Sequence, residues 1–249
     1  MPMLNKISQR FNPFSAAGLN LNTRSFLRGV KIGRKALRPY QATNGHRLAI
    51  GLSTVLTALL LGLPAQAHHP MGGTTPTTAL AGFLSGLGHP IIGVDHFAFV
   101  VALGLIASFS RRGFVLPVAF VLATLAGTGL HLTGLDLPGA EVGISLSVVL
   151  AGAVLAAYRK LGAAVLAGLG AVAGILHGYA YGEAIIGAEM SPLVAYLAGF
   201  AVIQLVVAGS AFWAGRRCQR AAEPLLTLRF AGFAIAGAGA AFLSSTLLG

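Results

Sequence analysis

The chain has 249 residues, of which 55% are hydrophobic and only 9% are charged, and its mean hydropathy is +0.79. Soluble domains carry about 25% charged residues, so an ordinary soluble enzyme is all but excluded. The formal net charge of +11 suggests a nucleic-acid partner, but residues 1–47 alone hold nine Lys and Arg and no acid. Residues 68–249 hold eight Lys and Arg against six acids, a net charge of +2. The basic character therefore belongs to a terminal tail and not to a nucleic-acid-binding surface.

The first element in chain order is an apolar run over residues 48–63 with a basic residue directly before it. A Pro-Ala-Gln-Ala sequence ending at Ala67 follows, with small side chains where a signal peptidase requires them. These features are typical of a secretory signal peptide over residues 48–67, after which the mature chain would begin at His68. The alternative is an uncleaved first membrane helix, and in both cases residue 68 emerges on the outer side. Residues 1–47 are expected to form a basic, disordered extension.

Six apolar stretches follow the leader. A helix that crosses a bilayer needs about 20 predominantly apolar residues, and no strand-like alternation competes with these stretches. Their connections are short, so successive helices should run antiparallel. The predicted fold is all-α: a polytopic membrane protein whose bundle of about six transmembrane helices forms one transport domain over residues 68–249. The stretches are residues 88–109, 114–135, 140–158, 161–182, 192–214 and 225–248.

The positive charges predict the orientation of this bundle. All eight Lys and Arg of the predicted mature chain lie in or beside alternate connections between the spans. The positive-inside rule places these connections in the cytoplasm, so both mature termini are expected outside. The leader predicts the same orientation independently, and together they predict a multi-pass protein of the bacterial inner membrane. The eight residues are Arg111, Arg112, Arg159, Lys160, Arg216, Arg217, Arg220 and Arg229.

Carboxylates and imidazoles collect at the opposite, outer ends of the predicted helices. Five of the six acids and all six histidines of the predicted mature chain lie there, and Glu223 is the exception. This one-sided clustering suggests a site for a cation. The eleven residues are Asp95, Asp136, Glu141, Glu183, Glu189, His68, His69, His89, His96, His131 and His177.

The densest group of ionisable residues lies in the first predicted span. On one continuous helix, His89 and His96 would lie about 20° from alignment and could face one cavity. Asp95 would point about 100° away from His96, which suits a role in orienting a neighbouring side chain. Ionisable groups inside a membrane cost about 2.5–3.5 kcal/mol each on insertion scales, so the three need a compensating partner.

Other candidate residues lie near the ends of later spans. A glycine stripe at every fourth position of residues 170–182 predicts close helix packing. His177 lies beside that stripe and Glu183 follows it, while Glu141 begins the third span. His131 ends a polar face of the second span, where a helix–helix hydrogen bond would explain it equally well.

The available donor atoms favour a divalent transition metal. Imidazole and carboxylate without thiolate suit nickel, cobalt or zinc, and the single cysteine, Cys218, excludes a disulfide framework and a cysteine cluster. No prosthetic group is expected, only Ni²⁺ or Co²⁺ bound transiently. The predicted metal-binding residues are His89, Asp95, His96, His177, Glu183, Glu141, His131, and His68 and His69 beside the new amino terminus.

Three motifs carry a resemblance to a known family. His89-Pro90-x-x-Gly93-x-Asp95-His96 resembles the HPxxGxDH signature of the HupE/UreJ family. Residues 177–183 are similar to its HGxAxGxE stretch with one residue fewer before the acid, and residues 137–141 resemble its LPxxE sequence. The resemblance covers about residues 68–249, and residues 1–47 depart from it. It implies a nickel or cobalt permease of the kind encoded with hydrogenase and urease systems.

The expected function is therefore facilitated or secondary uptake of nickel or cobalt through a His/carboxylate site at the outer side, and not an enzymatic activity. The expected partners are the metal ion and the lipid bilayer, with no nucleic acid, and self-association is left open. One alternative is a metal-binding membrane accessory factor for metalloenzyme assembly. The other is an intramembrane metallohydrolase, against which the absence of an HExxH pair counts.

Overall fold

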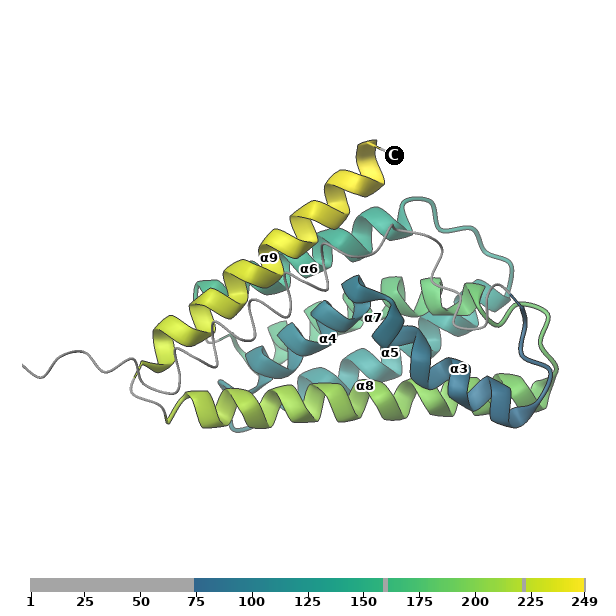
Figure 1. Ribbon diagram of the computed structural model, residues 1–249, viewed down its shortest axis with the longest axis horizontal. Coiled ribbons are helices and arrows are strands. Elements are labelled where there is room, and N and C mark those ends of the chain that lie inside the picture. The colour runs from purple at the N-terminus through teal and green to yellow at the C-terminus, as the bar shows by residue number, and fades with distance from the viewer. Residues whose placement is uncertain (1–73, 159–160, 221–222, 249) are drawn as a thin grey trace, which may run out of the picture. The chain divides into compact units, whose positions relative to one another are not determined.

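The computed structural model describes residues 74–158, 161–220 and 223–248 (Figure 1). Within these ranges the chain forms seven α-helices and no strand, so the all-α prediction is confirmed. The predicted extension, residues 1–47, and the predicted leader, residues 48–67, lie outside the described residues. The helices are α3 (Ala79–Ile92), α4 (Val94–Ala107), α5 (Val115–Leu132), α6 (Ala140–Ala156), α7 (Ala163–Glu183), α8 (Met190–Cys218) and α9 (Pro224–Leu248).

All six predicted spans are helical, but they differ in length. Among the described residues, α5, α7, α8 and α9 are each long and apolar enough to cross a membrane. Helices α3 and α4 qualify only as a pair, which makes a fifth candidate, and α6 is a shorter apolar helix of 17 residues. A helix of that length rises about 25 Å, near the lower limit for the hydrocarbon core. The chain is therefore a polytopic helical membrane protein.

The first predicted span is not the straight helix that the sequence pattern indicated over residues 88–109. The chain already becomes helical at Ala79, and α3 and α4 meet at Gly93 with a bend of 78°. Gly93 has an extended ψ of 94°, and a Cβ there would lie 2.6 Å from Cδ2 of His96. The His96 ring thus occupies the space beside Gly93, so a larger residue at the bend would displace that ring.

Helices α5 and α7 pack closely along the glycine stripe that the sequence predicted. Cβ atoms at Gly174 and Gly178 would overlap the backbone of α5 at Phe120 and Thr124. Thr128 adds a hydrogen bond of 2.7 Å from its hydroxyl to the carbonyl oxygen of Gly178. Absence of side chains on α7 therefore brings the two backbones together, as small residues do in membrane bundles.

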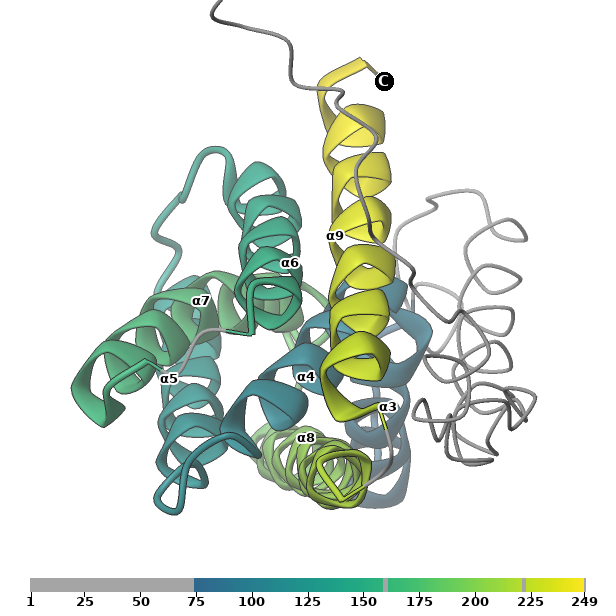
Figure 2. The ribbon, with the colours of Figure 1, turned by 90° about the vertical axis from the view of Figure 1, so that its left-hand side faces the viewer.

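The packing partners also establish which helices run parallel. Helix α5 is parallel to α7, since Leu116 meets Gly170 and Thr124 meets Gly178 along the pair. Helix α6 is antiparallel to α9, because Gly232 lies against Ala156 whereas the later Gly239 lies against the earlier Val149. Figure 2 shows both pairs side by side. This pattern agrees with an alternation of chain direction from span to span.

Helix α4 lies in the middle of the described helices. It packs against α5, α6, α8 and α9, and most of its residues are buried. Its amino-terminal end, which carries Asp95 and His96, is consequently held inside the bundle near α3 and α7. This position brings the first motif together with the second.

Candidate metal site

Three histidines from three helices meet in the interior. His89 of α3, His96 of α4 and His177 of α7 are all at most 4% exposed. The ring centroids of His96 and His177 are 4.9 Å apart, and those of His89 and His96 are 5.9 Å apart. The structure thus brings together three of the predicted site residues. The bend at Gly93, and not one helix face, places His89 beside His96.

Hydrogen bonds indicate which nitrogen of His96 carries a proton. The hydroxyl of Ser147 donates its single hydrogen to the carbonyl oxygen of Ile144, at 2.6 Å. It must then accept a hydrogen bond from Nε2–H of His177, at 2.9 Å. Neutral His177 therefore has its lone pair on Nδ1, which lies 2.8 Å from Nδ1 of His96 and accepts a hydrogen bond from it. Neutral His96 accordingly carries its proton on Nδ1 and its lone pair on Nε2.

The same reasoning applies to His89. The hydroxyl of Tyr196 donates to the carbonyl oxygen of Tyr181 at 2.8 Å, and carbonyl oxygens only accept. The Tyr196 oxygen therefore accepts from Nδ1–H of His89, at 3.0 Å. In neutral His89 and His96, Nδ1 is therefore the protonated ring nitrogen, and a neighbouring group anchors it in each case.

Sequence reasoning did not place Ser147 or Tyr196 at the site. Each hydroxyl donates to a backbone carbonyl oxygen and therefore accepts a hydrogen bond from a histidine. Tyr196 lies 107 residues from His89 along the chain. Neither belongs to a motif, and serines and tyrosines in membrane helices are common packing residues. A polar side chain in an otherwise apolar span is the one signal that could have indicated them.

Asp95 stands at the beginning of α4, beside the histidines. Its Oδ1 accepts a hydrogen bond of 2.8 Å from the backbone N–H of His96. A carboxylate in the first turn also interacts favourably with the positive end of the helix dipole. Asp95 therefore fixes the backbone that carries His96, in line with the orienting role suggested by the sequence.

The remaining described candidates lie at helix ends. Glu141 and Glu183 are exposed, the first in the first turn of α6 and the second at the end of α7. His131 packs its ring against Tyr179, with centroids 4.2 Å apart, and lines a cavity of about 300 Å³ that Asp136 also lines. His68 and His69 lie outside the described residues.

No set of three or more His, Cys, Asp or Glu side chains within the described ranges is arranged to hold one metal ion. What the described helices offer is a pair of imidazoles, His89 and His96, with supporting groups around them. Any further ligands of a cation bound there would have to come from water or from other kinds of group.

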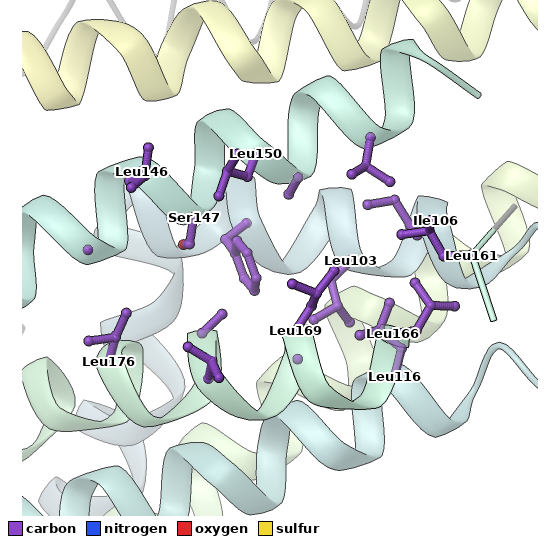
Figure 3. A pocket seen from close by; sticks show the side chains of 17 residues that line it. Leu103, Ile106, Leu116, Leu146, Ser147, Leu150, Leu161, Leu166, Leu169 and Leu176 are labelled. Carbon is purple, nitrogen blue, oxygen red and sulfur yellow. The ribbon is translucent and has the colours of Figure 1, made fainter. Parts of the chain in front are cut away.

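A separate cavity of about 240 Å³ lies between α4, α6 and α7 (Figure 3). Leucine side chains such as Leu103, Leu150 and Leu169 line it, and Ser147 is the labelled polar residue among them. An apolar lining cannot replace the hydration shell of a divalent cation. We therefore do not place the metal site in this cavity.

An all-helical bundle of membrane-spanning helices defines a polytopic membrane protein, and three imidazoles are buried in its interior. The chain matches the family "HupE / UreJ protein" over residues 56–242. It is 34% identical to Protein HupE of Rhizobium leguminosarum bv. viciae over 196 residues, which cover 77% of this chain and 96% of that protein. The chain therefore belongs to the HupE/UreJ family, as the motifs indicated.

No solved structure matches this chain. Membership of the family implies an accessory function related to nickel or cobalt transport, and the members are accessory transporters and not enzymes.

Proposed function

We propose that this protein is a permease that carries Ni²⁺ or Co²⁺ through the bacterial inner membrane. The observation that carries the proposal is the pair of interior imidazoles, His89 and His96, whose neighbours hold both rings in a metal-binding tautomer. Imidazole nitrogen is a preferred ligand of both metals. Family membership independently supports nickel or cobalt as the cargo.

In this proposal His89 and His96 bind the cation through Nε2. His177 orients His96, because its two ring nitrogens are already engaged with His96 and Ser147. Asp95 supplies negative charge at the first turn of α4, close to the incoming cation. Outer partners of metal-binding histidines commonly control metal affinity in this way.

The exposed acids would attract the cation before it reaches the interior. Glu141, Glu183 and Asp136 all lie at helix ends on the side of the bundle where α5 ends and α6 begins. The positive-inside rule makes this the outer side, and His131 lies there too. His68 and His69 would join this group if the leader is removed after Ala67.

The membrane potential is a sufficient driving force. A divalent cation that enters a cell at 100 mV gains about 4.6 kcal/mol, because each charge contributes about 2.3 kcal/mol. At about 1.4 kcal/mol per tenfold change, this corresponds to more than a thousandfold accumulation. Transport therefore needs no nucleotide hydrolysis, and the sequence contains no Walker A motif.

Uptake of nickel and cobalt by cells that express His96→Gln and His96→Ala tests the proposal. Both variants are expected to lose most uptake while the protein remains in the membrane at normal abundance. His131→Ala is the comparison, since it removes an imidazole outside the interior group and should retain more uptake. Wild-type uptake by the His96 variants would contradict the proposal.

Reconstitution into proteoliposomes separates a permease from a metal-binding accessory factor. We expect the wild-type protein to produce a flux of Ni²⁺ or Co²⁺ that depends on the membrane potential. Binding of the metal without any flux would contradict a permease and would support the accessory factor.

A further inference from the structure

We propose that the hydroxyl of Tyr181 is a further polar group of the metal site, which hydrogen-bonds to a water ligand of the bound cation. This inference rests on the proposed function, because it assigns a role within the same interior site. Tyr181 is not one of the residues that define the sequence motifs. It lies near the end of α7, between the motif residues Ala180 and Gly182.

The first observation is that the hydroxyl is buried without a hydrogen-bond partner. Tyr181 is 0% exposed, and its oxygen contacts no hydrogen-bonding group in the part of the chain that the structure describes. The hydroxyls of Tyr179 and Tyr196, by contrast, are bonded to backbone groups. Buried hydroxyl groups are nearly always hydrogen-bonded, so the partner of this one must come from outside the described protein groups, as a water or a bound ion does.

The second observation is the place of the ring. The Tyr181 ring meets the His89 ring edge-on at a centroid distance of 5.0 Å and the His96 ring at 4.6 Å. It therefore touches both proposed metal ligands at once. Its own carbonyl oxygen accepts the hydrogen bond from Tyr196 that anchors His89. Tyr181 thus contacts both His89 and His96.

The third observation concerns the coordination that two imidazoles leave unfilled. Nickel and cobalt take four to six ligands in ordinary nitrogen and oxygen sites, and His89 and His96 supply two. Within the described ranges, no third His, Cys, Asp or Glu completes the set. Water retained from the hydration shell would fill the remaining positions, and such water needs hydrogen-bonding groups around it. Tyr181 is the polar side chain in contact with both imidazoles that lacks a partner of its own.

The variant Tyr181→Phe tests this inference in the full-length protein purified in detergent, with Co²⁺ alone as the probe. Three quantities are measured: the Kd for Co²⁺ by calorimetry, the visible absorption of the bound Co²⁺, and the unfolding temperature without metal. Tyr179→Phe is the matched control, since it removes a hydroxyl from the same helix that is bonded to Leu135 and Leu137.

We expect the Kd of Tyr181→Phe to rise about 10- to 100-fold, the range typical of groups that support metal ligands. The absorption of bound Co²⁺ should change, because its water ligands are no longer held in the same geometry. The unfolding temperature without metal should stay the same or rise, because the variant removes a buried hydroxyl that had no partner. Tyr179→Phe should bind Co²⁺ as the wild-type protein does.

Two outcomes would overturn the inference alone: a Kd and spectrum like those of the wild-type protein, or a weaker Kd with an unchanged spectrum and a lower unfolding temperature, which would indicate a packing role. Failure of the proposed function has a different signature. In that case the wild-type protein would bind no Co²⁺, or variants of His89 and His96 would bind it normally, and the inference would fall with it.

Discussion

At the scale of single residues, the interior site depends on hydrogen bonds that fix imidazole tautomers. Ser147 and Tyr196 each donate to a carbonyl oxygen and therefore accept from a histidine. Because both hydroxyl groups donate to backbone carbonyl oxygens, the helix backbone determines which nitrogen of each histidine carries the proton. Under the proposed function, Nε2 of His89 and of His96 would bind the metal, and their Nδ1 contacts would stay in place.

This network predicts that Ser147→Ala weakens metal binding although Ser147 is not a proposed ligand. Without the hydroxyl, Nε2–H of His177 loses its acceptor. His177 can then shift its proton to Nδ1, where it would oppose the proton on His96. We expect a rise of about tenfold in the Kd for Co²⁺ measured by calorimetry, at the lower end of effects of supporting groups.

Ser145→Ala is the control for this experiment. Ser145 is also buried on α6, and no hydrogen bond from its side chain to a histidine occurs in the described part of the chain. Equal Kd values for Ser147→Ala and Ser145→Ala would show that the tautomer of His177 does not matter for binding.

At the scale of helices, close packing at glycine positions determines where the histidines stand. His177 and Gly178 are neighbours on α7, so the distance between α5 and α7 also sets the depth of the His177 ring in the bundle. A Cβ at Gly178 would overlap the backbone oxygen and Cα of Thr124. The second motif therefore combines a histidine that is hydrogen-bonded to His96 with the glycine that lets α7 pack against α5.

We predict that Gly178→Ala destabilises the protein, whereas Gly168→Ala on the same helix does not. The first change forces α5 and α7 apart and should cost about 1–3 kcal/mol of unfolding free energy, as overpacking does. A Cβ at Gly168 meets no atom within 4 Å, so alanine there should be neutral or stabilise by up to about 1 kcal/mol. Denaturant titration in detergent measures both.

If Gly168→Ala destabilised the protein more than Gly178→Ala, α5 and α7 would not be in close contact at Gly178. Metal binding by Gly178→Ala provides a second readout, since displacement of α7 should also weaken Co²⁺ binding through His177. A destabilised variant that binds Co²⁺ normally would show that the seating of α7 and the site are independent.

At the scale of the whole molecule, charge is separated between the two ends of the bundle. Arg216 donates to the carbonyl oxygen of Ser110, and Gln219 donates to Ser108, so the α4–α5 connection and the end of α8 lie together. The exposed acids Glu141 and Glu183 belong to the opposite helix ends. A cation would therefore meet negative charge on one side and positive charge on the other.

The single cysteine, Cys218, provides a test of orientation because it lies at the arginine-rich end of α8. A membrane-impermeant maleimide should leave Cys218 unlabelled in intact cells and label it in inverted membrane vesicles. Asp136→Cys, introduced together with Cys218→Ser, should show the reverse pattern because residue 136 belongs to the acidic end. Labelling of Cys218 from outside would reverse the proposed topology.

Much of the fold follows from composition alone. Apolar stretches of about 20 residues predict membrane helices because an unpaired backbone group is too costly in lipid, and the six stretches are helical as expected. The break at Gly93 escaped prediction because an apolar run has the same composition in a straight helix as in a bent one. The start of the first helix at Ala79 was missed because the span was located by hydropathy alone, although Thr78 caps this helix by accepting a hydrogen bond from the N–H of Ala81.

The sequence by itself determined the helical membrane fold, the separation of charge and the candidate residues of the proposed metal site, because hydropathy, charge and donor atoms are properties of the residues themselves. Only the tertiary structure decided that His89 and His96 meet across a bend, that His177 supports His96, and that Ser147, Tyr181 and Tyr196 surround the pair. Those relations depend on contacts between helices far apart in the chain, and such contacts are set by backbone packing that no local pattern encodes.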